Sequence, residues 1–173
     1  MMNTHKIALV GVLTAAAIVV SILESFIPSV GIPGVKLGLA NILIIITLYE
    51  IGVVEAILVN LIRVFITGLL RGTLMSMGFL MSLTGAVLSL GIMILFYLLI
   101  KQFSVIGVSV IGSLFHVTGQ ILIAMIFLGT AYIIFYLPII AISAIITGVF
   151  VGLVSGAIIK TGVIKKEREK YNF

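Results

Sequence analysis

The sequence predicts an all-α integral membrane protein, a bundle of six transmembrane helices. Of its 173 residues, 62% are hydrophobic and 9% are charged, and the mean hydropathy is +1.46. A water-soluble domain of this length needs far more polar surface than this composition supplies. Several apolar runs also reach the roughly 20 residues that a helix needs to cross the hydrocarbon core. Composition and run length together therefore exclude a soluble fold.

Charged residues, prolines and glycines separate the apolar runs into six predicted spans. The spans lie at roughly 7–27, 37–50, 53–70, 74–100, 104–128 and 132–159. The first run is too long for the apolar region of a cleavable signal, so we expect it to stay in the membrane. The second span is short and the fourth is long. The chain is expected to form a single transmembrane domain, residues 1–173, that ends in a charged tail over 160–173.

The basic residues are distributed unevenly between the two sides of the membrane. An even number of spans places both termini on one side, together with Lys6, Lys101, Lys160 and most of the charged tail. Lys36 and Arg71 fall on the other side. Cytoplasmic segments carry the excess of Lys and Arg in membrane proteins. The sequence therefore predicts a multi-pass protein of the cell membrane with both termini in the cytoplasm.

Composition and missing motifs exclude several functional classes. Half of the ten Lys and Arg residues lie from Lys160 onward, as expected of a cytoplasmic anchor rather than of a nucleic-acid-binding surface. The chain has no Cys, which excludes disulfides, thiolate metal sites and thiol catalysis. It also has no nucleotide-binding glycine loop, nucleophile elbow or zinc signature. We predict that the chain is not an enzyme, that it holds no cofactor or metal, and that it has no nucleic-acid partner.

Arg63 is the clearest ionisable residue inside a predicted span. A guanidinium at the centre of a membrane helix costs about 2.5–3.5 kcal/mol on translocon scales, so it requires a partner, a cavity or a short route to the interface. Asn60 lies about one turn before Arg63 on nearly the same face, and the two side chains together suit an anionic or strongly accepting ligand. Glu24, at similar depth in the first span, offers a structural salt bridge instead. The two roles are compatible, and both stay open at this point.

Two further spans carry polar residues at mid-membrane depth. His116 and Gln120 are four residues apart in the fifth span, so both project from one helical face. This pairing favours a polar patch that faces a cavity, although a buried His is also a common packing residue. Ser82 in the fourth span has small neighbours, which allow another backbone or a ligand to approach closely.

The entry to the second span is broken and cationic. Pro33 and Gly34 prevent a regular helix immediately before Lys36, and Asn41 lies close to the outer end of the span. Broken backbone and charge at membrane depth are tolerated where protein or a cavity satisfies their polar groups. Lys36 favours an anionic ligand, although Glu24 would cancel one positive charge and leaves the sign of the ligand open. We predict an outward-facing cavity roofed by residues 28–36 and lined by Asn41, Asn60, Arg63, His116 and Gln120.

Small residues at helical spacing mark two packing faces. In the sixth span, Gly148, Gly152 and Gly156 follow each other at four-residue steps, the pattern that lets membrane helices touch through their backbones. We expect that face to meet another span of the same chain. A second seam, near the cytoplasmic end of the first span and positioned to contact a partner, consists of Ala8, Gly11 and Ala15.

Several motifs together resemble a known family. The most specific motif begins at Pro33 and ends in Lys36-Leu37-Gly38-Leu39-Ala40-Asn41. The supporting motifs are Arg63 with Gly68 and Gly72, Ser82-Leu83-Thr84-Gly85, Gly107-Val108-Ser109, His116 and Gly119-Gln120. Over about residues 7–160, the chain resembles the Gx transporter family, which is also labelled heptaprenyl diphosphate synthase component I. That family is similar to the substrate-binding S components of energy-coupling factor (ECF) transporters.

This resemblance implies a six-helix S component that captures a small molecule from outside. The implied partners are a transmembrane coupling subunit and two cytoplasmic ATPases. Such proteins often dock the coupling subunit through small residues on the first helix, which Ala8, Gly11 and Ala15 match only loosely. The synthase label implies instead an accessory membrane subunit of isoprenoid (heptaprenyl) diphosphate synthesis or recycling. Because the chain has no Asp for an Asp-rich magnesium motif, it is not expected to be that catalyst itself.

Overall fold

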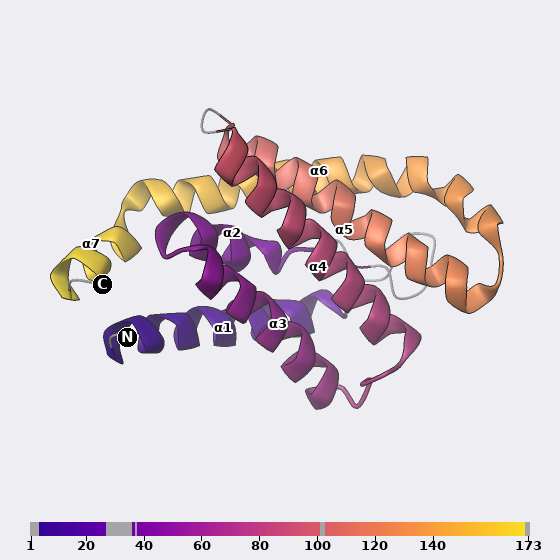
Figure 1. The fold of residues 1–173 in the computed structure, drawn as a ribbon, viewed down its shortest axis with the longest axis horizontal. Coiled ribbons are helices and arrows are strands. Elements are labelled where there is room, and N and C mark those ends of the chain that lie inside the picture. Colours follow the sequence, from indigo (N-terminus) through magenta and orange to yellow (C-terminus); the bar gives the residue numbers. More distant parts are fainter. Residues whose placement is uncertain (1–3, 27–35, 37, 101–102, 172–173) are drawn as a thin grey trace.

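The computed structural model describes residues 4–26, 36, 38–100 and 103–171, and these residues form helices without any strand (Figure 1). The predicted all-α class is therefore confirmed for the described part of the chain. In chain order, the helices are α1 (Thr4–Glu24), α2 (Asn41–Glu50), α3 (Val53–Leu70), α4 (Met77–Leu99), α5 (Val105–Leu128), the 3-10 helix η1 (Ala131–Tyr136), α6 (Leu137–Thr161) and α7 (Val163–Tyr171).

Among the described residues, five helical segments are long and apolar enough to cross a membrane. They are α1, α3, α4, α5 and the segment Ala131–Glu167, which contains η1 and α6. The ten residues of α2 rise only about 15 Å, about half of a hydrocarbon core that is about 30 Å thick. The predicted count of six complete helical spans is therefore not confirmed, because the helix within the second predicted span, 37–50, begins only at Asn41.

The short helix α2 begins and ends where the backbone turns. Gly38 has a φ of +86°, and the N–H of Asn41 donates to its carbonyl at 2.9 Å, which forms the turn that leads into the helix. After the helix, Gly52 has a φ of +153°, a conformation that favours glycine. α2 packs against α1, α3 and α6. Its fully buried side chains make it a central part of the core: Ile44, Ile45, Ile46 and Leu48.

Helices α1 and α3 run in the same direction. Lys6, near the start of α1, forms an ion pair of 2.6 Å with Glu55, near the start of α3. Arg63 in the second half of α3 donates to the hydroxyl of Ser21, near the end of α1. The start of α1 and the C-terminal helix α7 also lie at the same end of the molecule in Figure 1. The end of α3 that carries Arg71 therefore lies away from both termini, as the distribution of basic residues predicts.

The glycine seam of α6 is internal, and it involves two of the three predicted glycines. A Cβ added to Gly148 would lie 2.7 Å from the Cα of Val110 on α5, and one added to Gly152 would lie 2.6 Å from the Cα of Ile106. At these two positions, the helices touch through their backbones. Gly156 makes no such contact within the described residues, since an added Cβ would meet no heavy atom within 4 Å, and its part in a packing face stays a prediction. This glycine lies beyond the segment where α5 and α6 approach closely.

A second close crossing joins α4 to α5. A Cβ added to Gly119 would lie 2.9 Å from the backbone nitrogen and Cα of Gly85. The small residues after Ser82 therefore admit another backbone, as the sequence predicts. This crossing brings α5 and its polar residues His116 and Gln120 against α4.

The small residues of α1 form an uncovered face. Ala8, Gly11 and Ala15 are exposed, and a Cβ added to Gly11 would meet no heavy atom within 4 Å. No described part of this chain occupies that face. Its use as a docking surface for a partner subunit stays a prediction.

Replacement of the α6 glycines by alanine tests the seam. We expect Gly152→Ala to lower the free energy of unfolding by about 1–3 kcal/mol, because its methyl group collides with the backbone of Ile106. Gly156→Ala is the matched control on the same helix and is expected to leave stability unchanged or slightly higher. Thermal unfolding of the detergent-solubilised protein measures both. Equal midpoints for the two variants would contradict the assigned seam.

Candidate functional site

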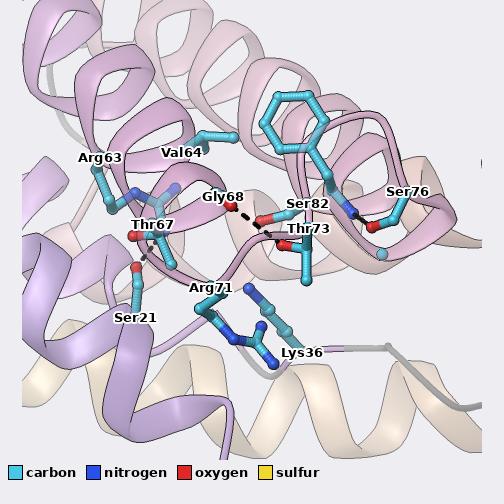
Figure 2. A pocket seen from close by; sticks show the side chains of 12 residues that line it. Ser21, Lys36, Arg63, Val64, Thr67, Gly68, Arg71, Thr73, Ser76 and Ser82 are labelled. Atoms are coloured by element: carbon cyan, nitrogen blue, oxygen red, sulfur yellow. Dashed lines mark hydrogen bonds between the residues drawn. The ribbon is translucent and has the colours of Figure 1, made fainter.

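A pocket of about 140 Å³ lies between α1, α3 and the start of α4 (Figure 2). It occurs at the end of the bundle where α3 finishes and α4 begins. One wall comes from α3, and Lys36 closes the pocket from the segment that precedes α2. The lining residues are Ser21, Lys36, Arg63, Val64, Thr67, Gly68, Arg71, Thr73, Ser76, Gly78, Phe79 and Ser82.

The lining is cationic. The described residues of the lining include Lys36, Arg63 and Arg71 and several hydroxyl groups, and none of them is acidic. Burial lowers the pKa of the Lys36 ammonium below its usual value, Glu24 partly offsets this effect, and Arg71 and Arg63 lower the pKa further. The ammonium therefore lies in a partly desolvated place among other cations, and a negative charge in the pocket would stabilise its protonated form. The charge of these groups suits an anion.

Arg63 forms the buried wall of this pocket. Only 3% of the residue is exposed, and its two terminal nitrogens donate to Ser21 at 3.2 Å and to the side-chain oxygen of Asn60 at 2.7 Å. Asn60 in turn donates to the carbonyl of Ala86 on α4 at 2.9 Å. The Nε of Arg63 and the hydroxyl of Thr67 are buried without a hydrogen-bond partner in the structure. The guanidinium thus joins α1, α3 and α4 and retains an unused donor.

The turn between α3 and α4 shapes the opening of the pocket. Gly72, with a φ of +62°, ends α3 in the left-handed conformation that glycine adopts without strain. The N–H of Gly72 donates to Leu69, and that of Thr73 donates to Gly68, which together form a Schellman motif. Ser76 then caps α4 by accepting from the N–H of Phe79 at 3.2 Å. Because Ser76 and Phe79 line the pocket, the positive end of the α4 dipole faces it.

Two side chains hold the backbone at Lys36 and just after it. The amide of Gln120 accepts from the N–H of Lys36 at 2.9 Å and donates to its carbonyl at 3.2 Å. The carboxylate of Glu24 accepts from the N–H groups of Gly38 and Leu39. A non-helical segment inside a bundle requires partners for its backbone groups, and these contacts supply them. They also fix where the Lys36 side chain enters the pocket.

The structure separates the predicted site residues into two groups. Lys36, Arg63 and Ser82 line the pocket. The other five lie behind it and contact the pocket wall or its support: Glu24, Asn41, Asn60, His116 and Gln120. Direct ligand contacts by these five stay predictions. The roof predicted over 28–36 lies outside the described residues except for Lys36.

Asn41 and His116 meet close to Gly38. Asn41 is buried and donates to the hydroxyl of Ser89 on α4 at 3.3 Å. A Cβ added to Gly38 would lie 3.2 Å from the side-chain nitrogen of Asn41 and 3.4 Å from the His116 ring. These two side chains therefore pack under the turn into α2 and support it.

The salt bridge between Glu24 and Arg63, which the sequence left open as an alternative, is absent from the ion pairs of the described residues. The ion pairs among described residues join Lys6 to Glu55 and Lys165 to Glu169. Glu24 binds the backbone N–H groups before α2 instead, and Arg63 binds neutral oxygens. The N–H groups of Gly38 and Leu39 compete with Arg63 for the Glu24 carboxylate. Residue spacing along the chain does not reveal this competition.

The pocket also contains several hydroxyl groups besides that of Ser82, and the side chain of Arg71, which the span pattern places only on the side of the membrane opposite the termini. Thr67 lies four residues after Arg63, so helical spacing would have placed it on the same face. Arg71 is exposed and lines the pocket together with Lys36. The positions of Thr73 and Ser76 depend on the turn between two helices, which the span pattern does not predict.

Comparison with known proteins places the chain in a family. The family model for heptaprenyl diphosphate synthase component I matches residues 13–158. The chain belongs to the heptaprenyl diphosphate synthase component I family. No curated protein and no solved structure matched the chain. The family name, through the words "component I", implies a partner component.

Loss of the Gln120 amide should release the Lys36 segment. We expect Gln120→Ala to lower the free energy of unfolding by about 1–3 kcal/mol, since each lost hydrogen bond contributes about 0.5–1.5 kcal/mol. Hydrogen exchange at the Lys36 amide should become faster. Thr118→Ala on the same helix is the control, because its hydroxyl bonds only to the carbonyl of Leu114. Unchanged exchange at Lys36 in the Gln120 variant would contradict the assigned role.

Proposed function

We propose that this protein is the substrate-binding S component of an ECF-type ABC transporter that captures a small anionic metabolite from outside. The observation that carries this proposal is the cationic pocket formed by Lys36, Arg63 and Arg71 at the end of the bundle away from the termini. The distribution of basic residues supports an orientation with that end outside the cell membrane and both termini in the cytoplasm. A pocket on the outer side suits capture.

Transport requires partners in this proposal. No ATP-binding motif occurs in the sequence, so ATP hydrolysis takes place on two cytoplasmic ATPases that act through a transmembrane coupling subunit. The exposed small residues of α1 are the face on which the coupling subunit docks. ATP-driven movement in the complex then releases the ligand inward.

One observation favours a second function. The family name refers to heptaprenyl diphosphate synthesis, and a pocket with three cations also suits the diphosphate of an isoprenoid. In this alternative, the chain is an accessory membrane subunit that delivers or recycles a lipid diphosphate for a separate synthase.

Co-purification from native membranes separates these two functions. An affinity-tagged chain should recover two ATPases and a coupling subunit if it is an S component. Recovery of a prenyl synthase without ATPases would instead support the accessory role and contradict the transport proposal. Mass spectrometry of the same preparation identifies any small molecule that the chain retains.

Arg71→Ala tests the pocket without disturbing the fold. Because Arg71 is exposed, its replacement should change the free energy of unfolding by no more than about 0.5 kcal/mol. The amount of ligand retained from native membranes should nevertheless fall, since one of three cations is lost. Lys166→Ala, an exposed basic residue of α7, is the matched control and should retain the wild-type amount. Equal retention by both variants would show that the ligand binds elsewhere.

A further inference from the structure

The pocket has room for a small anionic group. Its volume is about 140 Å³. A tetrahedral oxyanion has only five non-hydrogen atoms, so one such group fits the available space.

The charge around the pocket suits a dianion. Lys36, Arg63 and Arg71 supply three positive charges, and none of the described lining residues is acidic. Glu24 lies behind the lining, where its carboxylate field reaches Lys36. Three cations and one carboxylate leave an excess of two positive charges. The N-terminus of α4, a helix of 23 residues, adds a partial positive charge of about one half.

The wall also offers hydrogen-bond donors that the protein does not use. Arg63 is almost fully buried and its Nε has no partner, and the neighbouring Thr67 hydroxyl is also without one. Figure 2 shows the Lys36 ammonium and the Ser82 hydroxyl pointing into the same space beside these groups. Arg63 and Thr67 therefore retain hydrogen-bonding capacity that no described residue of the protein uses.

We propose that this pocket binds a doubly charged phosphate group, either of a phosphate monoester or at the end of a diphosphate. The inference rests on the proposed function, because it takes the pocket as the capture site. A carboxylate or a sulfate ester would bring a single charge and leave one cation unneutralised in a desolvated place. A phosphate dianion also has three outer oxygens, which suit donors from Arg63, Lys36 and Ser82 together.

Methyl phosphate and methyl sulfate test the charge requirement, because the two esters have the same shape and differ in charge. Calorimetric titration of the full chain in nanodiscs of zwitterionic lipid measures both. At about pH 7.5, we expect methyl phosphate to bind at least about tenfold more tightly. At about pH 5, its affinity should fall about tenfold, because a monoester with a second pKa of about 6 is then about one-tenth dianion. Methyl sulfate should not show that loss.

The methyl sulfate titration separates the protonation of the ligand from any effect of pH on the protein. A change in the protein that weakens the pocket at low pH would weaken the binding of both esters. A loss of affinity that is confined to methyl phosphate therefore reports on the ligand.

The experiment distinguishes a failure of the phosphate inference from a failure of the proposed function. Equal binding of methyl phosphate and methyl sulfate would overturn the phosphate inference and leave the capture site in place. Absence of binding by either ester would overturn both the inference and the pocket as capture site. A chain that binds neither ester but still recovers ATPases would keep the transport function and require another site.

A pair of serine variants tests the geometry. Ser82→Ala removes a hydroxyl that points into the pocket, and we expect it to weaken methyl phosphate binding about tenfold while the unfolding midpoint is unchanged. Ser113→Ala removes a buried hydroxyl of α5 that also has no partner but lies outside the pocket lining. It should leave the affinity unchanged. Equal affinities of the two variants would overturn the assigned contact.

A water-soluble ester and a lipid are the two sources of such a phosphate, and the same assay distinguishes them. A short prenyl phosphate that binds more tightly than methyl phosphate would assign the site to a lipid headgroup. Equal affinity of the two would assign it to a soluble phosphorylated metabolite. Both results support the phosphate inference.

Discussion

A guanidinium withdrawn from water has to be surrounded by acceptors, and Arg63 meets this requirement by binding to two other helices. Ser21 on α1 accepts from it directly, and Asn60 transmits the contact to the carbonyl of Ala86 on α4. These acceptors are neutral, so the positive charge is solvated by dipoles and is not cancelled within contact distance. Arg63 therefore fixes three helices and still contributes its charge to the pocket.

The segment before α2 depends on the same arrangement. Glu24 binds backbone N–H groups there, so it does not pair with Arg63. Gln120 holds the backbone of Lys36 from α5, whose close crossing with α4 at Gly85 and Gly119 brings it within reach. The polar residues of the bundle thus have two roles. Glu24 and Gln120 hold the backbone in place, and the cations face the pocket.

The long helices could be predicted from the sequence because the thickness of the membrane sets the length of each apolar run. The sequence also predicted the internal glycine seam, since four-residue spacing places Gly148 and Gly152 on one face. The extent of α2 was harder to predict, because apolar residues before Asn41 continue the run although the backbone is not helical there. Apolar composition alone does not show at which residue helical hydrogen bonding begins.

The candidate site was predicted in part, for a similar reason. Lys36, Arg63 and Ser82 stand out as polar groups inside or beside apolar runs, and all three line the pocket. The partner of Glu24 could not be predicted, because it depends on which donors the folded backbone leaves free. Arg71 could not be distinguished from an interface anchor, since its place in the pocket depends on the turn that begins at Gly72.

An anion held between Lys36, Arg63 and Ser82 is the central claim, and anomalous diffraction tests it most directly. Crystals of the protein soaked in tungstate, a tetrahedral dianion, should give one strong anomalous peak within hydrogen-bond distance of these three side chains. A peak that appears only at the basic residues of α7, with none in the pocket, would contradict the account.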